Sequence, residues 1–365
     1  MAISKIPMQG FSEQGINFRN IIINGDMSIA QRATSVTGVG NGDNSCHTVD
    51  RFSFYEEGST SGEFTMSQDT DVPTGYGFTK STKLDCTTAD ASLAASEVIA
   101  LEYKWEGLHL QHLKKGTSNA ESLTLSFWVK TNKTGTYVAN FYDNDNDRHT
   151  SQNYTVSSAN TWEKKIITFA PDTSGTLTND NTLALAMYFI LGAGTSYTSG
   201  SAATSWETFT GNAANWCGGQ NVNIFDHTDN NFWITGVQLE VGTTASDFEF
   251  LPYEINLSRC ERYCRLFGSG VQGRASNTST FYFSEPMQPA MRASPTLTLT
   301  DTSFGVGNYV SYDKTASSSS LQLARSSRTG IAGSADGFTG LTGSDQLQVW
   351  YNLTSDTWLM ATAEL

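Results

Sequence analysis

The feature that most constrains the fold of this chain is a strict alternation of apolar and polar side chains in residues 122–130, SLTLSFWVK. Successive side chains of a β-strand point to opposite faces, so a period of two predicts a strand with one buried face. The buried face would carry Leu123, Leu125, Phe127 and Val129. The opposite face would carry Thr124, Ser126, Trp128 and Lys130. We therefore predict a half-buried strand here.

Other segments share the strand pattern, and the composition agrees with it. Residues 183–191, LALAMYFIL, are apolar on both faces, so we expect this strand to be covered on both sides, by another sheet or by a second subunit. In residues 232–242, FWITGVQLEVG, the second half alternates as an amphipathic strand. Aromatic residues make up 12% of the chain and charged residues only 16%. Because aromatic side chains fit a half-buried pleated surface, the chain is predicted to be all-β.

One segment breaks this pattern. Residues 255–267, INLSRCERYCRLF, place apolar side chains at spacings of three, four and three, which is one stripe along a helix. The stripe consists of Leu257, Cys260, Cys264 and Phe267. A helix this short is unstable alone in water, so its apolar side must dock on something. Two partners stay open: the chain's own sheet, as a domain interface, or sister chains, as a subunit interface. The heptad-like spacing and the doubly apolar strand at 183–191 favour assembly.

The charge of the chain excludes two classes of partner. Its 36 acidic and 22 basic residues give a formal net charge of -14. Nucleic acids are bound by a basic footprint, and anionic lipid headgroups repel an acidic surface, so we expect neither partner. No stretch approaches the roughly 18 to 20 apolar residues of a membrane helix, so no membrane insertion is expected. Residues 1–11 have no apolar h-region, so no secretory signal is predicted.

No metal site is predicted from the histidines or cysteines. The five cysteines are odd in number and lack CxxC spacing, which favours free thiols in a reducing cytosol over a disulfide framework or a zinc site. If the segment GLHLQHL is a strand, His109 and His112 point to opposite faces, which defeats chelation. We also find no GxSxG motif, no cysteine beside a plausible histidine partner and no P-loop, so no catalytic residue and no cofactor is assigned.

One acidic turn is a further candidate metal site. Asp143, Asp145 and Asp147 begin like a calcium loop. However, Arg148 stands where that loop needs Gly, and Tyr154 stands where it needs Glu. We therefore predict a solvated turn.

Glycan binding has better physical grounds. The C–H patches of a sugar stack on a flat aromatic ring, so an aromatic residue on the polar side of a strand is a candidate platform. Trp128 is such a residue; the alternative is that a neighbouring strand or subunit covers it. Tyr142, Trp206 and Trp216 lie in turn-rich stretches and are further candidates.

Several of these segments, taken together and in order, resemble a family of bacteriophage virion proteins of the tail-fibre or receptor-binding type, which has a jelly-roll domain like a carbohydrate-binding module. The matching stretches lie between residues 17 and 267, and FSEPMQPAMRASPTLT resembles the start of the family's C-terminal β-region. The other stretches are NFRNIIINGDMSIAQRA, TVDRFSF, LTLSFWVKTNKTGTY, NTWEKKIITFAPDTSGT, ITGVQLEVG and SRCERYCRLF.

The resemblance implies a non-enzymatic structural protein of a phage virion, made in the host cytoplasm. It also implies a homotrimer that contacts other virion proteins and takes part in host attachment, with host surface polysaccharide as a further partner. Two alternatives are a polysaccharide depolymerase and a purely architectural virion component. The segment INGDMS also resembles carbohydrate-binding modules that hold a structural calcium, but Gly236 stands where an acid would be expected, so no calcium site is carried over.

These observations predict four parts of the chain. Residues 1–16 form an N-terminal segment, and residues 17–250 form a jelly-roll β-sandwich. A linking helix spans residues 251–267, and a smaller C-terminal β-domain spans residues 268–365.

Overall fold

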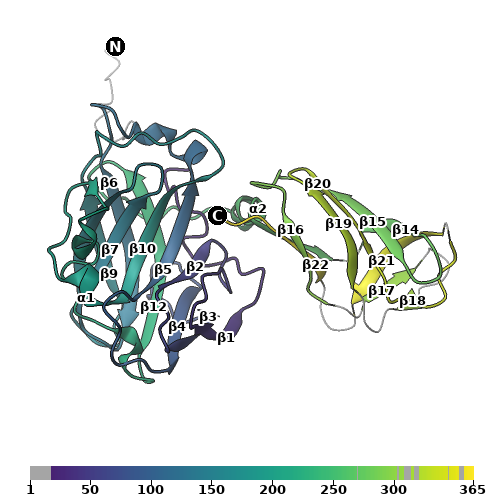
Figure 1. The fold of residues 1–365 in the computed structure, drawn as a ribbon, viewed down its shortest axis with the longest axis horizontal. Helices are drawn as coiled ribbons and strands as arrows, with labels where there is room; N and C mark the ends of the chain where they lie inside the picture. The colour runs from purple at the N-terminus through teal and green to yellow at the C-terminus, as the bar shows by residue number, and fades with distance from the viewer. Residues whose placement is uncertain are drawn as a thin grey trace, which may run out of the picture. The chain divides into compact units, whose positions relative to one another are not determined.

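The protein is described by a computed structural model, which covers residues 18–268, 270–301, 304–307, 314–315, 320–343, 345–352 and 357–365. The chain divides into two compact units, with unit 1 ending at Leu251 and unit 2 beginning at Pro252. The predicted N-terminal segment, residues 1–16, lies outside the described residues. The sheets of both units are antiparallel and the helices are few and short (Figure 1), so the predicted all-β class is confirmed.

Unit 1 is a jelly-roll β-sandwich of two six-stranded sheets, which we call sheet A and sheet B. In spatial order, sheet A consists of β1 (Ser35–Gly40), β3 (Glu63–Asp69), β4 (Ser81–Thr88), β12 (Asn231–Val241), β6 (Leu123–Thr131) and β9 (Glu163–Phe169). Sheet B consists of β11 (Glu207–Thr208), β8 (Arg148–Val156), β7 (Gly135–Asp143), β10 (Leu183–Ala193), β5 (Val98–Glu106) and β2 (Phe52–Glu57).

The core of unit 1 lies between the two sheets. The predicted alternation in β6 is confirmed, because Leu125, Phe127 and Val129 are fully buried. The ring of Phe127 meets the ring of Phe189 from β10 edge to face, with 4.9 Å between their centroids. Edge-to-face contacts of this kind add to the hydrophobic contribution of the buried rings.

Strand β10 is buried on both faces, as predicted, and the second cover comes from the chain itself. Its side chains that point away from sheet A pack against Tyr197, Trp216 and Cys217. These residues belong to the stretch after β10 that contains α1 (Thr195–Thr198) and the 3₁₀ helix η3 (Ala213–Asn215). The outer side of β10 therefore needs no second subunit to cover it.

The remaining short helices of unit 1 lie in its connections. They are the 3₁₀ helices η1 (Gly107–His109), η2 (Gln111–Leu113) and η4 (Ile224–Asp226).

Unit 2 contains two further antiparallel sheets. The three-stranded sheet has the order β13 (Cys264–Gly268), β22 (Thr357–Thr362) and β16 (Thr296–Leu299). The seven-stranded sheet has the order β18 (Lys314–Thr315), β17 (Phe304–Gly307), β21 (Gln346–Asn352), β14 (Gln272–Ala275), β15 (Phe281–Pro286), β20 (Gly330–Ala335) and β19 (Leu321–Ser327). Trp358 packs on Phe283 and Phe304 at centroid distances of 5.0 and 4.7 Å, and these rings belong to the core of this unit.

The predicted helix at 251–267 is wrong in its second half. Helix α2 spans only Tyr253–Glu261, and Cys264 begins strand β13. Cys264 pairs with Thr362 and Phe267 pairs with Leu359, both on β22. The single apolar stripe is therefore divided between a helix and a strand, although Leu257 and Cys260 do lie on α2. A local spacing of three and four could not reveal β22, which lies almost one hundred residues later and offers its backbone groups to this segment.

The partners of this segment lie in unit 2. Phe267 is buried in the core of unit 2, and α2 and β13 both fall on the same side of the division at Leu251. Cys264 is fully buried, whereas Leu257 is partly exposed. For Cys264 and Phe267, pairing and burial within one chain account for the apolar character that suggested a subunit interface.

Candidate functional site

The four aromatic residues that the sequence singled out lie in three different places. Trp128 lies on the outer face of sheet A, on the side opposite the buried Phe127. Tyr142 and Trp216 lie on the outer side of sheet B. Trp206 lies beside a buried ion network. The structure therefore brings only Tyr142 and Trp216 together.

Around Trp128, the outer face of sheet A gathers three indoles and a phenol ring, which we call the indole face. It consists of Trp128 on β6, Trp233 on β12, Trp162 just before β9, and Tyr76 in the connection between β3 and β4. In the register of β6 and β12, Trp233 lies opposite Lys130, and Trp128 lies opposite Thr235. Because side chains two positions apart share a face, Trp128 and Lys130 point to the same side.

Two aspartates fix the orientation of the indoles. The indole nitrogen of Trp233 donates to Asp69 Oδ2 over 3.1 Å. The indole nitrogen of Trp162 donates to Asp71 Oδ1 over 2.9 Å, and the other oxygen of Asp71 accepts from Lys130. These bonds hold the rings before any ligand arrives, which reduces the entropy lost on binding.

Lysines occupy the spaces between the rings. The ammonium of Lys130 lies 4.5 Å from the Trp233 ring centroid and 5.9 Å from that of Trp162. Lys83 lies 5.1 Å from the Trp233 centroid on its other neighbouring strand, β4. Cation–π attraction at such distances adds about 0.5 to 1 kcal/mol at exposed sites. The indole face is thus an ordered network of rings, ammonium groups and carboxylates.

Part of this network is open to solvent. Tyr76 is 54% exposed, and its ring lies 4.3 Å from the Trp128 ring between centroids, tilted by 50°. Trp128, Trp162 and Trp233 are partly exposed. An exposed ring beside lysine and aspartate side chains can stack on a sugar ring and bond its hydroxyl groups.

The acid at the base of this face is ionised at neutral pH. Partial burial alone would raise the pKa of Asp69. Hydrogen bonds from Trp233 and from the backbone N–H groups of Asp71 and Thr70, together with nearby Lys83, outweigh burial and lower the pKa of Asp69 below its usual range. A carboxylate in this state accepts hydrogen bonds only.

Sequence reasoning missed three members of the indole face. Trp233 carried a usable signal, because it alternates with Phe232 and Ile234, which are fully buried in β12. Tyr76 and Trp162 stand outside the strands, and no local pattern marks them. Tyr76 lies in the connection between β3 and β4, and Trp162 in the connection between β8 and β9, where it donates to Asp71 of the first connection.

The outer side of sheet B holds a second group of rings. Trp216 packs edge to face on Tyr188 and Phe209, with centroid distances of 5.3 and 5.7 Å, and Phe209 meets Tyr142 at 5.5 Å. Trp216 is only 3% exposed, so its ring is not open to a sugar and the prediction of a glycan platform is wrong for it. Burial arises because the stretch after β10 folds back on sheet B.

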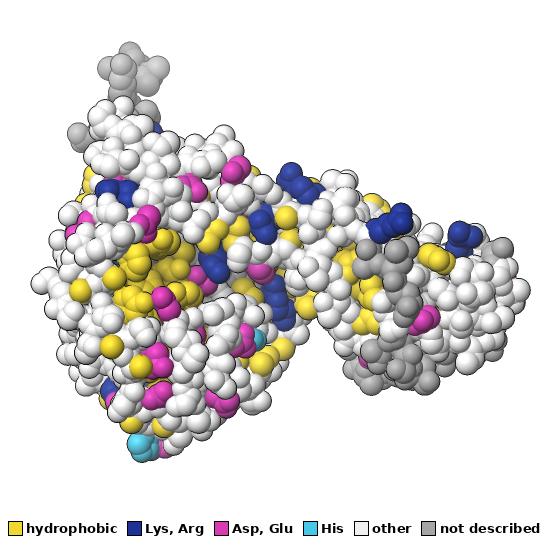
Figure 2. Space-filling model, viewed as in Figure 1, with side chains coloured by type: hydrophobic (Ala, Val, Ile, Leu, Met, Phe, Trp, Pro, Cys, Tyr) yellow, Lys and Arg dark blue, Asp and Glu magenta, His cyan; other side chains and the backbone are white. Residues whose placement is uncertain are grey.

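The edge of this ring cluster reaches the surface. Tyr55, Tyr142, Leu183 and Phe209 are partly buried and pack against it. Figure 2 shows hydrophobic side chains gathered on this face of unit 1, over β7, β10 and β5. We call Tyr55, Tyr142, Leu183 and Phe209 the apolar patch of sheet B. Tyr142 also donates its hydroxyl proton to Asp147 over 3.0 Å.

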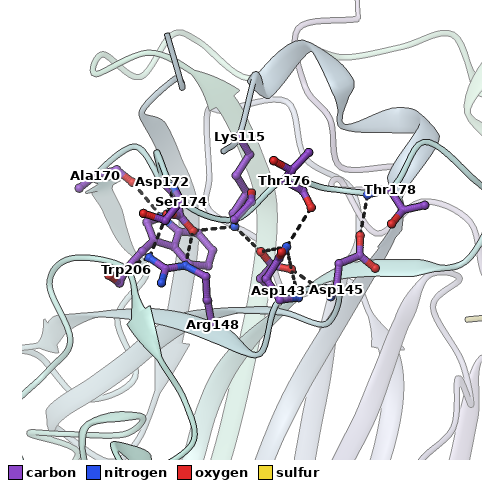
Figure 3. A network of polar contacts seen from close by, with 12 residues as sticks. Lys115, Asp143, Asp145, Arg148, Ala170, Asp172, Ser174, Thr176, Thr178 and Trp206 are labelled. Atoms are coloured by element: carbon purple, nitrogen blue, oxygen red, sulfur yellow. Dashed lines mark hydrogen bonds and ion pairs between the residues drawn. The ribbon is translucent and has the colours of Figure 1, made fainter. Parts of the chain in front are cut away.

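Trp206 borders an ion network that the sequence did not predict (Figure 3). Lys115 donates to Asp143, to Asp172 over 2.7 Å and to the carbonyl oxygen of Gly175 over 3.3 Å. Arg148 binds Asp172 through two hydrogen bonds of 2.8 and 3.0 Å. Trp206 lies below the Lys115 ammonium at 4.3 Å. Its indole nitrogen donates to a backbone oxygen, which gives Trp206 a structural contact rather than a free edge.

The predicted solvated turn is therefore only partly correct. Asp143 is fully buried, and its carboxylate faces Lys115. Asp145 accepts the backbone N–H of Thr178 over 2.8 Å. Asp147 is also paired near the surface, where Thr210 and Tyr142 donate to it. The alternation of acids could not show that Lys115, from a distant connection, lies between the carboxylates of Asp143 and Asp172.

The histidines and Gly236 have local explanations. His109 and His112 lie on two consecutive 3₁₀ helices, so the condition of a strand, on which the argument from opposite faces rested, is not met there. In the described part of the chain, no group of three or more His, Cys, Asp or Glu side chains is placed to hold a metal ion. Gly236 has a positive φ of 61°, and a Cβ there would lie 2.5 Å from the Phe78 ring. This position therefore requires glycine for steric reasons.

No helix within the described ranges is long and apolar enough to cross a membrane.

Comparison with known proteins gives fold-level similarity only. No protein family and no curated protein matches the chain. Among solved structures, the enzymatically active domain of bacteriophage CBA120 tailspike protein 4 is similar with a TM-score of 0.31 and 12% identity, over 61% of this chain and 21% of that one. The chain thus matches about a fifth of the length of the tailspike domain.

Two sugar-binding proteins are similar to the same degree. A putative sugar binding protein from Bacteroides thetaiotaomicron has a TM-score of 0.31 and 11% identity, over 61% of this chain and 99% of that one. A family 11 carbohydrate-binding module of a Clostridium thermocellum cellulase has a TM-score of 0.28 and 10% identity, over 58% and 96%. Similarities this weak do not indicate what this chain binds.

Proposed function

We propose that this chain is a non-enzymatic surface protein of a phage virion that attaches to its host by binding surface glycan on the indole face. The observation that carries the glycan proposal is the gathering of Trp128, Trp162, Trp233 and Tyr76 on one outward sheet face, with two indoles held by carboxylates. Rings fixed in this way, with charged hydrogen-bonding groups between them, suit a ligand that presents both C–H patches and hydroxyl groups. The virion role rests on the sequence resemblance.

A binding assay tests the indole face. The full chain is applied to an array of bacterial surface polysaccharides, and its affinity for the best binder is then measured by titration calorimetry. Loss of one stacked ring costs about 1.4 kcal/mol, so Trp128→Ala should weaken binding about tenfold. Tyr76→Ala should weaken it as well.

The matched control for Tyr76→Ala is Tyr253→Ala, because Tyr253 is 61% exposed on α2 in the other unit. This control should leave the affinity unchanged. Wild-type affinity in both Trp128→Ala and Tyr76→Ala would refute the assignment of the indole face.

The proposal includes no catalysis. Incubating the chain with a polysaccharide that it binds should release no new reducing ends. New reducing ends would show a depolymerase instead. If phage particles that carry Trp128→Ala adsorb to host cells as well as wild-type particles do, the purely architectural alternative is favoured.

We further propose that the virion form is a homotrimer in contact with other virion proteins. The support in the structure is the apolar patch of sheet B, since exposed apolar surface of this kind often marks an interface. Light scattering on the purified chain should give about three times the chain mass of 39.7 kDa. A stable monomer at micromolar concentration would contradict this part of the proposal.

A further inference from the structure

Unit 2 contains a hollow that shares no residue with the indole face. Its volume is about 620 Å³, and it lies along β14 and β15 next to the start of β21. The polar side chains that share its face of the sheet are Gln272, Arg274, Tyr282, Ser284 and Gln346. Glu285 also borders the hollow, but it lies three positions from Tyr282 on β15, so its side chain falls on the opposite face with those of Phe281 and Phe283. The hollow is therefore lined by amide, guanidinium and hydroxyl groups and by the ring of Tyr282.

The floor of the hollow is rigid. Gly273 on β14 pairs with Phe283 on β15, and a Cβ at Gly273 would lie 1.9 Å from the carbonyl oxygen of Tyr282 and 2.6 Å from the buried Phe281 ring. Only glycine permits this close approach of the two strands. At the end of the hollow, Gly270 has a φ of 98°, and a Cβ there would meet nothing within 4 Å. The space beside Gly270 is thus open.

Tyr282 and Arg274 face each other across the two strands. They are directly opposite in the register, and the guanidinium carbon of Arg274 lies 5.9 Å from the centroid of the Tyr282 ring. Tyr282 is 36% exposed, although the neighbouring Phe281 and Phe283 are buried in the core. Among the described residues, no carboxylate forms an ion pair with Arg274. A ring and a guanidinium thus remain available to a ligand in the hollow.

The balance of charge selects the class of ligand. One guanidinium, from Arg274, lies on this face together with neutral amides and hydroxyl groups. A cationic ligand would be repelled by Arg274, whereas the hydroxyl groups of a sugar can accept from Arg274 and can both donate to and accept from the amides. A ligand that is rich in hydroxyl groups and carries no positive charge therefore fits the hollow.

We propose that this hollow is a second glycan-binding site, which takes a sugar ring without a positive charge, stacked on Tyr282. Arg274 and the amides of Gln272 and Gln346 bind its hydroxyl groups. The site lies in a different unit from the indole face, so neither proposal requires the other. If both sites bind, one chain holds a polysaccharide at two points, and the second contact is strengthened by effective concentration.

The test uses the full chain with two of the four aromatic rings of the indole face removed, as Trp128→Ala/Trp233→Ala. This double variant, labelled with a fluorophore, is applied to an array of neutral, acidic and amino-substituted oligosaccharides, and the best binder is followed by titration calorimetry. We expect binding to at least one neutral or acidic oligosaccharide. Adding Tyr282→Ala or Arg274→Ala should weaken that binding by tenfold or more.

Tyr253→Ala is again the matched control, since it removes an exposed tyrosine of the same unit outside the hollow. Circular dichroism melting confirms that each variant is folded, and Tyr282→Phe separates the ring from its hydroxyl. Tyr282→Phe should keep most of the affinity, because stacking needs only the ring.

Three results would overturn the proposal: no binding to any neutral or acidic oligosaccharide, binding unaffected by Tyr282→Ala and Arg274→Ala, or binding restricted to amino-substituted oligosaccharides. Failure of the indole face would appear separately. In that case Trp128→Ala/Trp233→Ala would bind as wild type does, and the affinity would still depend on Tyr282.

Discussion

Lys115 is the residue whose replacement should most disturb unit 1. Its side chain is 6% exposed, and the two carboxylates that it contacts, on Asp143 and Asp172, are 0% and 2% exposed. In Lys115→Met, Asp172 keeps its two bonds to Arg148, but the described contacts leave Asp143 only uncharged donors. A buried charge without its partner costs about 3 to 5 kcal/mol. We therefore expect the free energy of unfolding of unit 1 to fall by this amount.

This loss can be measured by urea unfolding followed by tryptophan fluorescence, because six of the eight tryptophans lie in unit 1. For a unit of this size, a loss of about 3 to 5 kcal/mol lowers the melting temperature by roughly 6 to 20 °C. Methionine fills similar volume, so the effect reports the charge more than a cavity.

The chain offers a matched control in the neighbouring residue. Lys114 also forms an ion pair, with Glu121, but the two side chains are 53% and 32% exposed. Exposed pairs contribute about 0 to 1 kcal/mol, so Lys114→Met should be close to wild type. Adding Asp143→Asn to Lys115→Met removes the orphaned charge and should recover part of the lost stability. If Lys115→Met unfolds within 1 kcal/mol of Lys114→Met, the reasoning from burial is wrong.

The other stability predictions concern the core, one glycine and acid. Phe127→Ala should cost about 3 to 5 kcal/mol in urea unfolding because Phe127 is fully buried, whereas Ile166→Ala, at a site 57% exposed, should cost less than about 0.5 kcal/mol. Equal losses in the two variants would contradict the assigned core. Gly236→Ala should cost about 1 to 3 kcal/mol, since the positive φ and the Phe78 ring both oppose a Cβ. A melting temperature equal to that of wild type would show that the backbone there relaxes. Burial alone would raise the pKa of Asp172, but bonds from Arg148 and Lys115 and from a backbone N–H lower it below its usual range. A carboxyl group whose pKa is lowered in the folded state stabilises the protein at pH values above its ordinary pKa, which is about 4. This stabilisation should be lost as the pH falls below about 4. Melting curves between pH 3 and pH 7 check this, and Asp172→Asn should flatten the acid slope.

Strand prediction succeeded where a pattern is local. The alternation in β6 identified its buried face, and the doubly apolar run at 183–191 identified a strand covered on both sides. The same reasoning failed after Glu261. Over so few residues the spacing of apolar side chains does not distinguish a helix from a strand, and pairing with β22 makes this segment a strand. The prediction of an exposed ring failed for Trp216, because exposure depends on which other segment of the chain covers the ring. No periodicity within the chain contains that information.

In the candidate site, too, local features could be predicted from the sequence and contacts between distant segments could not. Trp128 could be placed on the polar side of its strand from sequence, since the side of a strand depends only on its neighbours in the chain. Its companions could not be found in this way, because Trp162 reaches Asp71 across 91 positions and Trp233 reaches Asp69 across 164. The ion pair of Asp143 in the acidic turn could not be predicted either, because its partner Lys115 lies 28 positions away in the chain.

By itself, then, the order of residues determined the all-β character of the chain, its strand faces and the outward direction of Trp128, since alternation acts between adjacent side chains. The tertiary structure alone decided which rings gather, which carboxylates are buried and where the helix ends. Those outcomes depend on contacts between segments that are distant in the chain, and their energies are set by burial and geometry that no short stretch of sequence records.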